Sequence, residues 1–260
     1  MKSSQGVVIQ SVERALTILD LFSGSDSELG ISEIAEKMHL NKSTVYGLVN
    51  TLALSGLIEQ GDISKKYRLG IKLFVLGNLV GSRIDLREEA KPYCRKLAAD
   101  YHCGAHLAVR SDYEMIYIDK VDPPSIAISF SYVGKRARMY CTGIGKAMLA
   151  FMQNDFVEDY LDNVPLEAVT PKTITDRTIF MRELAQIRAC GYAVDDEEAE
   201  PGIKCVAAPI FGWNGSPTAA ISCSGSAALM TPAFVDDVRH DVIKYANILS
   251  ERMGYVHDRT

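Results

Sequence analysis

Several features that would place a protein in a special class are missing from this sequence of 260 residues. It carries 28 basic and 33 acidic side chains, and the net charge of −5 provides no global basic field to attract nucleic acid. No apolar stretch approaches the ~20 residues that span a bilayer. No charged start, apolar run and small-residue cleavage site mark a signal peptide. We therefore expect a cytoplasmic protein without a membrane partner.

Cysteines at Cys-x-x-Cys spacing are also missing. The six cysteines are Cys94, Cys103, Cys141, Cys190, Cys205 and Cys223. In a chain long enough to build its own core, this pattern favours reduced thiols. His102 and His106, with Cys103 between them, have the spacing of a metal site on a helix. Gly104 interrupts such a helix and a third ligand is not evident, so we expect no metal and no cofactor.

The first seventy residues contain three segments with apolar residues at helical spacing, followed by two strand-like runs. Asn41 suits the N-cap of the third helix, and Gly56 suits its left-handed C-terminal position. The strand-like runs at 57–60 and 66–69 flank a turn at 61–65. The apolar positions are Val12, Ala15, Leu16 and Leu19, then Ile31, Ile34, Ala35 and Met38, then Val45, Leu48, Val49 and Leu52. The pattern predicts a winged helix-turn-helix over 1–70.

The third helix has the properties of an element that reads the major groove. Its N-terminal N–H groups favour phosphate, and basic residues outnumber acidic residues four to two over 40–68. The predicted DNA contacts are Arg14, Lys42, Ser43, Thr44, Tyr46, Asn50, Lys65 and Lys66. Two alternatives stay open, because a winged helix can serve protein contacts alone and a lysine pair can be a solvated turn.

The remainder of the chain reads as a helical connector over 71–97 and an α+β domain over 98–260. Pro92 divides the connector or opens a new helix. Runs rich in β-branched and aromatic residues at 105–110, 114–120, 126–132, 204–211 and 218–224 predict strands. Asp176 and Gly191 mark the start and end of one helix, and Thr231-Pro232 opens another. We expect an antiparallel sheet flanked by helices.

Short stretches in both parts of the chain together resemble the IclR family of bacterial transcriptional regulators. In the first part they are SVERALTILD at 11–20, ISEIAEK at 31–37, KSTVY at 42–46 and YRLG at 67–70. In the second part they are TGIGKAMLA at 142–150, TIT at 173–175, GYAVDDEE at 191–198 and GIKCVAAPI at 202–210. One position departs from the family pattern, because Gly47 stands where an Arg often follows the Tyr of the reading helix. This departure removes a candidate base or phosphate contact.

The resemblance implies a DNA-binding regulator with a GAF-like effector-binding domain that responds to a small organic acid. It also implies a dimer or tetramer on a pseudo-palindromic double-stranded DNA operator. The backbone N–H groups of Gly143 and Ile144 would meet the effector carboxylate, and Asp195 would lie opposite. The rest of the polar lining would be Cys205, Ser222 and Ser224. Apolar closure is expected from Met139, Met148 and Ile203.

Each site residue also has a structural interpretation without a ligand. The glycines can serve helix entry alone, Cys205 can be a small buried hydrophobe, and Asp195 lies in an acidic run typical of a solvated loop. A catalytic Cys205 would make the chain an enzyme, but it needs a base, and no histidine lies between Asp195 and Ser224. A sensor without DNA binding is a further alternative. We expect a regulator with no catalytic residues.

Overall fold

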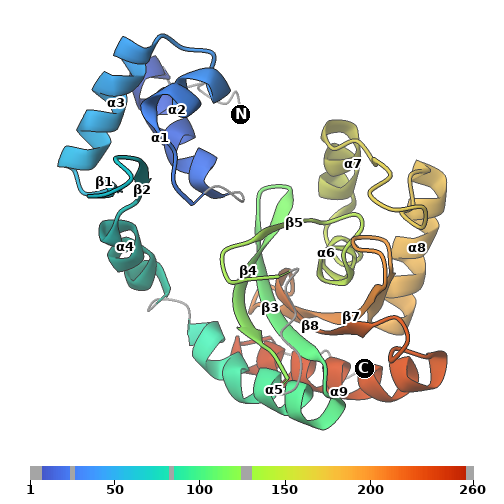
Figure 1. The fold of residues 1–260 in the computed structure, drawn as a ribbon. Helices are drawn as coiled ribbons and strands as arrows, with labels where there is room; N and C mark the ends of the chain where they lie inside the picture. The colour runs from blue at the N-terminus through green and yellow to red at the C-terminus, as the bar shows by residue number, and fades with distance from the viewer. Residues whose placement is uncertain (1–7, 24–26, 82–84, 124–130, 256–260) are drawn as a thin grey trace. The chain divides into compact units, whose positions relative to one another are not determined.

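The computed structural model describes residues 8–23, 27–81, 85–123 and 131–255. The chain folds into two compact units, Met1–Ile84 and Asp85–Thr260, each with its own hydrophobic core (Figure 1). None of the helices in the described residues is long and apolar enough to cross a membrane.

The first unit is a winged helix, as predicted. Its elements are α1 (Gln10–Asp20), the 3-10 turn η1 (Leu21–Ser23), α2 (Ile31–Lys37), α3 (Lys42–Leu54), β1 (Ile58–Gln60), β2 (Tyr67–Leu69) and α4 (Ile71–Gly81). Strands β1 and β2 pair antiparallel, with Glu59 opposite Arg68. Leu29 bridges to Tyr67, which ties the segment before α2 to the wing.

Local sequence signals explain where α3 begins and ends. Asn41 is the N-cap residue, as expected, although its side chain makes no capping hydrogen bond. Gly56 has a φ of 75°, which confirms the left-handed position expected after the helix. Val45 and Val49 are fully buried, so the apolar stripe of α3 faces the core of the unit.

The stripe predicted for α1 is partly wrong about which side faces inward. Ile18 is fully buried and Ala15 and Leu19 pack against the core, whereas Val12 and Leu16 are more than half exposed. The helical period was identified correctly, but α1 carries apolar residues on two faces. Its outer face therefore remains apolar in the single chain.

The second unit is an α+β domain around a six-stranded antiparallel sheet in the order β5-β4-β3-β8-β7-β6. Its strands are β3 (Gly104–Ser111), β4 (Glu114–Val121), β5 (Arg136–Arg138), β6 (Ala193–Asp196), β7 (Ile203–Phe211) and β8 (Pro217–Ser226). Its helices are α5 (Asp85–Tyr101), α6 (Gly143–Leu149), α7 (Asn154–Asn163), α8 (Arg177–Cys190) and α9 (Pro232–Arg252). Helices α5 and α9 cover one face of the sheet and α6 lies on the other (Figure 1).

Caps fix the ends of the long helices as the sequence indicates. The Asp176 carboxylate accepts a hydrogen bond from Ile179 N at 2.8 Å, and Gly191 ends α8 with a φ of 84°. Thr231 caps α9 by accepting from Phe234 N at 3.3 Å. These caps satisfy backbone groups that a helix end otherwise leaves open.

Two predictions about the connecting segments need correction or fall outside the described residues. Pro92 does not divide the connector, because it lies within the continuous helix α5. The segment predicted over 71–97 therefore spans α4 and most of α5. The strand predicted over 126–132 lies outside the described residues up to position 130, and 131–132 belong to no strand.

Candidate functional site

The outward face of α3 presents polar side chains at helical spacing. Ser43, Tyr46, Gly47 and Asn50 stand at positions i, i+3, i+4 and i+7, and all four are exposed. Arg14, on α1, is half-buried. The exposed predicted DNA contacts on α3 are Lys42, Ser43, Thr44, Tyr46 and Asn50. Ser43, Tyr46 and Asn50 share the outward face, and Lys42 and Thr44 are exposed on its flanks.

The two lysines of the wing have different surroundings. Lys65 is exposed, with a left-handed φ of 56°. Lys66 Nζ lies 2.9 Å from Glu33 Oε1 of α2, and Glu33 also accepts a hydrogen bond from Gly30 N at 2.6 Å. The Gly30 bond and then the Lys66 contact hold the pKa of Glu33 below its usual range. The charge of Lys66 is therefore already matched by a carboxylate, which the sequence pattern did not reveal.

The second unit contains a cavity of about 210 Å³ between the start of α6, the β6–β7 region and strands β4 and β5. This volume is below the ~300 Å³ at which sites for drug-sized ligands begin, so it suits a smaller molecule. Of the six predicted effector contacts, five line it. They are Gly143, Ile144, Asp195, Cys205 and Ser224.

The start of α6 leaves backbone donors at the cavity. The first intrahelical hydrogen bond runs from Lys146 N to Thr142 O at 2.9 Å. The N–H groups of Gly143 and Ile144 precede this bond, so the helix itself supplies no acceptor for them. Thr142 Oγ1 accepts from Gly145 N at 3.3 Å and donates to Arg138 O at 2.6 Å. A side chain at Gly143 would place its Cβ 3.1 Å from Cys205 Sγ, so glycine allows the helix to approach β7 closely.

Cys205 and the two serines lie on neighbouring strands. Cys205 pairs with Ser224 and Ala207 pairs with Ser222, which brings the three polar side chains to one face of the sheet. Ser222 is buried and does not line the cavity, so Ser224 is the serine of this pair that reaches it. Both serines lie close enough to the Cys205 thiol to lower its pKa, which opposes part of the effect of burial.

The protonation of Cys205 argues against a nucleophile. Burial, followed by the nearby Asp195, raises the pKa of its thiol to about 12, so it is not a thiolate at neutral pH. His106 on β3 is also buried, which lowers its pKa to about 4, and its Nε2 contacts Ser131 Oγ at 2.7 Å. An activated cysteine–histidine pair would need a thiol whose pKa is lowered and a histidine that can accept its proton near neutral pH.

Asp195 stands at the end of β6, where the chain turns toward β7. Its Oδ1 accepts hydrogen bonds from Glu198 N at 2.7 Å and Ala199 N at 3.4 Å. Burial raises the pKa of Asp195 to about 7, against the lowering effect of the Glu198 N–H bond. The acidic run 195–198 is therefore not a solvated loop, because its first and last residues are buried.

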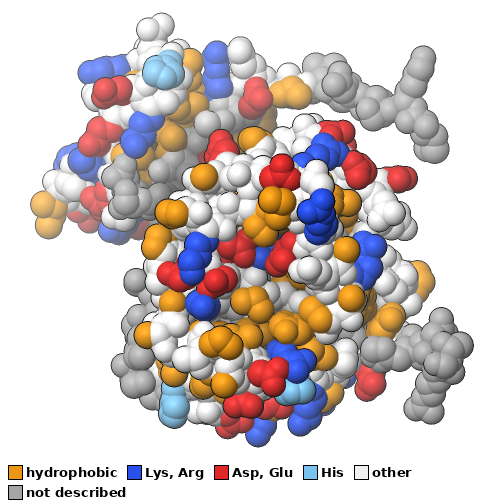
Figure 2. Space-filling view, turned by 90° about the vertical axis from the view of Figure 1, so that its right-hand side faces the viewer, with side chains coloured by type: hydrophobic (Ala, Val, Ile, Leu, Met, Phe, Trp, Pro, Cys, Tyr) orange, Lys and Arg blue, Asp and Glu red, His pale blue; other side chains and the backbone are white. Residues whose placement is uncertain are grey.

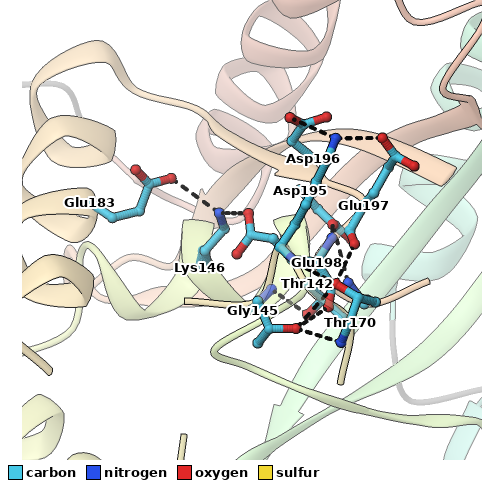
Figure 3. Close-up of polar contacts among 12 residues, drawn as sticks. Thr142, Gly145, Lys146, Thr170, Glu183, Asp195, Asp196, Glu197 and Glu198 are labelled. Carbon is cyan, nitrogen blue, oxygen red and sulfur yellow. Dashed lines mark hydrogen bonds and ion pairs between the residues drawn. The ribbon is translucent and has the colours of Figure 1, made fainter. Parts of the chain in front are cut away.

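A buried ion pair stands beside this turn (Figure 3). Lys146 of α6 is fully buried, and its Nζ lies 2.5 Å from Glu198 Oε1 and 3.1 Å from Glu183 Oε1 of α8. Burial lowers the pKa of Lys146, but the two carboxylates outweigh burial and the net pKa is raised. Lys146 thus remains an ammonium between α8 and the turn after β6, and it is this turn that borders the cavity.

Several residues of the cavity were not predicted from the sequence. Tyr117 of β4, Val169 and the segment 135–138 line it, and Ile203 does so as expected. Met139 and Met148 are instead fully buried in the core. The alternation of β4 could have indicated an inward Tyr117, but only the folded sheet brings 135–138 to α6.

Charge on the second unit is mixed rather than concentrated. Figure 2 shows Lys and Arg side chains interspersed with Asp and Glu. Arg136 pairs with Glu114 at 2.8 Å, and Arg138 lies 3.5 Å from Glu167, so these basic groups are matched outside the cavity. Within the described residues, no group of three or more His, Cys, Asp or Glu side chains could hold a metal ion. His102 ends up after α5 and His106 within β3, not on one helix.

A winged helix joined to an α+β unit is the architecture of one class of protein, the two-domain DNA-binding regulators. Residues 11–62 match the IclR helix-turn-helix domain, and residues 79–251 match the bacterial transcriptional regulator IclR C-terminal domain. The chain therefore belongs to the IclR family of bacterial transcriptional regulators.

Relatives cover almost the whole chain. The HTH-type transcriptional regulator XynR of Escherichia coli K12 is 37% identical over 248 residues, which cover 95% of this chain and 98% of that protein. The crystal structure of Thermotoga maritima IclR shares 34% identity with a TM-score of 0.76, covering 95% and 99% of the two chains. An IclR homologue from Microbacterium hydrocarbonoxydans complexed with 4-hydroxybenzoate has the same fold, with a TM-score of 0.82 at 24% identity over 94% and 98%. With such relatives the chain is a transcriptional regulator and not an enzyme.

Proposed function

We propose that this regulator binds a small organic acid in the cavity of its second unit and that the bound acid changes its affinity for an operator. The observation that carries the proposal is the convergence of α6 N–H groups, Asp195, Cys205 and Ser224 on one cavity of about 210 Å³. Backbone donors and a hydroxyl suit a carboxylate, and Asp195 suits a hydroxyl or a second acid group on the ligand.

Binding of the acid is tested by thermal shift with a panel of small carboxylates. The panel contains keto acids, sugar acids and 4-hydroxybenzoate, the ligand of the Microbacterium homologue. A ligand raises apparent stability by RT ln(1 + [L]/Kd), so a stabilising acid is identified directly. Ser224→Ala should remove the shift, whereas Ser222→Ala should retain most of it, because Ser222 does not line the cavity. Failure of every acid to stabilise the protein would contradict the proposal.

For DNA binding, we propose that α3 enters the major groove and that the wing contacts the backbone. The five exposed side chains of α3 and the exposed Lys65 support this orientation. Lys65→Ala should weaken binding to an upstream intergenic duplex and reduce the salt slope by about one ion. Lys66→Ala should weaken it less, because Glu33 already balances that charge. Anisotropy at several salt concentrations distinguishes them, and equal losses would show that DNA displaces Glu33.

Self-association is part of the proposed function, since two reading helices are needed for a pseudo-palindrome. Exposed apolar side chains on α1 and α4 support it. They are Ile9 at the start of α1, Val12 and Leu16 on α1, and Ile71, Phe74, Val75, Leu76 and Leu79 on α4. A soluble monomer rarely exposes so many large apolar groups on neighbouring turns of a helix.

The effector can act on DNA only by favouring one arrangement of units or subunits. We propose that the connector over 71–97 transmits this preference. It contains α4 with its exposed apolar surface and most of α5, which packs on β3 and α9. Gel shifts with and without a stabilising acid would measure the coupling, and an unchanged DNA affinity would contradict it.

A further inference from the structure

Lys146 is an unusual residue to find at the centre of a small domain. Its side chain has no exposed surface, and burying an ammonium in this way is strongly unfavourable unless carboxylates compensate for the lost hydration. Replacing such an ion pair by apolar residues is often neutral or stabilising. Stability alone therefore gives no reason for Lys146 to be charged, and its contacts have to be followed further.

The contacts lead from Lys146 to the effector cavity in two steps. Lys146 Nζ holds Glu198 Oε1 at 2.5 Å, and Glu198 N donates to Asp195 Oδ1 at 2.7 Å (Figure 3). Lys146 lies three residues after Gly143, on the same short helix. One side chain thus links the helix start at one wall of the cavity to the carboxyl group at the other wall.

The turn that carries Glu198 is held against its own backbone preference. Glu197 has a φ of 64°, a left-handed conformation that non-glycine residues seldom adopt. Thr170 Oγ1 donates to Glu197 O and Thr173 Oγ1 to Glu198 O, each at 2.7 Å. The second carboxylate oxygen of Glu198 is buried without a hydrogen-bond partner among the described residues. Lys146 is thus the cation that keeps this buried carboxylate in place.

We propose that Lys146 and Glu198 are positioning residues of the effector site, which hold the Asp195 carboxyl against the start of α6 and set its charge. The inference rests on the proposed function for the role of the cavity. The two residues act on Asp195 with opposite signs, because the Lys146 ammonium favours its carboxylate form and the Glu198 carboxylate disfavours it.

The other ionisable groups around Asp195 stay constant when either residue is replaced. On the sheet they are Tyr117 of β4 and Cys205 of β7, before α6 they include Cys141, and at the cavity they include Lys135, Arg136, Arg138 and Glu200. None of them changes between the variants below. A difference in sign between the variants therefore reports the Lys146–Glu198 pair itself.

The test measures the titration of Asp195 in full-length protein labelled with ¹³C-aspartate, with Asp195→Asn assigning the signal. Glu198→Gln should lower the titration midpoint by about one pH unit, because an ammonium is left near Asp195 without its closest carboxylate. Lys146→Met should raise the midpoint, because it removes the cation that favours the Asp195 carboxylate. If Glu198 takes up a proton in this variant, the midpoint should stay unchanged. Glu183→Gln is the matched control, since it removes the other carboxylate on Lys146, and Glu183 is not among the groups that shift the pKa of Asp195. It should shift the midpoint less than Glu198→Gln does.

A merely structural role predicts a different pattern. Loosening the turn would hydrate Asp195 and lower its midpoint in both variants, so a fall in Lys146→Met or no fall in Glu198→Gln would overturn the proposal. If Lys146→Met does not fold, the double variant Lys146→Met, Glu198→Gln removes the charge left behind. Its midpoint should lie above that of Glu198→Gln alone, and an equal midpoint would overturn the proposal. No effector is needed, so failure here is distinct from failure of the acid panel.

Discussion

Gly47 lies on the outer face of α3 that we propose reads DNA, at the position where the family resemblance leads us to expect an Arg. A Cβ added there would meet no atom within 4 Å, so the position is open on the outer face of α3. Gly47→Arg should strengthen binding to an upstream intergenic duplex and steepen its salt dependence by about one ion, because it adds a phosphate-reaching cation. Anisotropy titrations at several salt concentrations would measure both effects.

Gly47→Ala separates helix stability from DNA contact. It should stabilise the first unit by up to about 1 kcal/mol, since glycine is a poor residue in a helix interior, and leave the salt slope unchanged. If Ala strengthened binding as much as Arg, the gain would come from helix order rather than from a new contact.

Asp195 should make stability depend on pH. Its pKa of about 7 in the folded chain lies above the ordinary value of 3.8, so the stability it contributes is complete below pH 3.8 and is lost as pH rises through 7. Asp195→Asn keeps an oxygen acceptor for Glu198 N but cannot ionise. It should be more stable than the parent by roughly 2–4 kcal/mol at pH 8, with less than half of that difference at pH 5.

Urea unfolding followed by circular dichroism at pH 5, 6, 7 and 8 would measure this difference. A constant gap between the two proteins would mean that Asp195 is ionised throughout the range, as in a solvated turn.

Single residues were predictable from the sequence only where a local pattern or the family resemblance identified them. The residues Gly143, Ile144, Asp195 and Cys205 that the resemblance named line the cavity, but the resemblance did not separate Ser224 from Ser222, because both share one face of β8. No pattern in the sequence marks Lys146 as buried, because a lysine in a helix is normally solvated. Its partners Glu198 and Glu183 are 52 and 37 residues away in sequence, so no short-range pattern pairs them.

At the scale of elements, α6 depends on two glycines that act in different ways. A Cβ at Gly145 would overlap the Cα and carbonyl oxygen of Met139, whereas one at Gly143 would meet Cys205 Sγ at 3.1 Å and Ala207 Cβ at 3.4 Å. Gly145→Ala should therefore destabilise the second unit by about 3 kcal/mol or more, since backbone has to move. Gly143→Ala should cost about 1 kcal/mol and narrow the cavity.

Urea unfolding and the acid panel test this pair together. Gly143→Ala should remain folded and lose the thermal shift that a carboxylate gives the parent. A Gly145→Ala protein as stable as Gly143→Ala would show that α6 can move away from Met139.

Elements with strong end signals were predicted, and elements without them were missed. Asp176 and Gly191 bound α8 as expected, and the wing followed from two short runs around a turn. Helix α7 and strand β5 were not predicted, because β5 has only three residues and its pairing with β4 is decided across the sheet. Pro92 was misjudged because a proline within a helix normally breaks it, yet here it lies well inside α5.

At the scale of the whole molecule, the two units differ in how their helices bury apolar surface. The second unit encloses large clusters between sheet and helices, whereas α1 and α4 leave large apolar groups in water. Helical periodicity reveals that a helix has an apolar stripe but not what covers it. The sequence therefore predicts that these helices form, but it does not show that the rest of the chain leaves part of their apolar surface uncovered.

If α4 packs against a second copy of the chain, a charge on its exposed face should separate the copies. Phe74→Glu should reduce the mass measured by sedimentation velocity and weaken binding to the intergenic duplex, because each half-site then binds alone. Ile63→Glu is the matched control, since Ile63 at the wing tip is 98% exposed and lies outside the faces of α1 and α4. Its mass should equal that of the parent. If Phe74→Glu leaves the mass unchanged, the copies do not associate through α4.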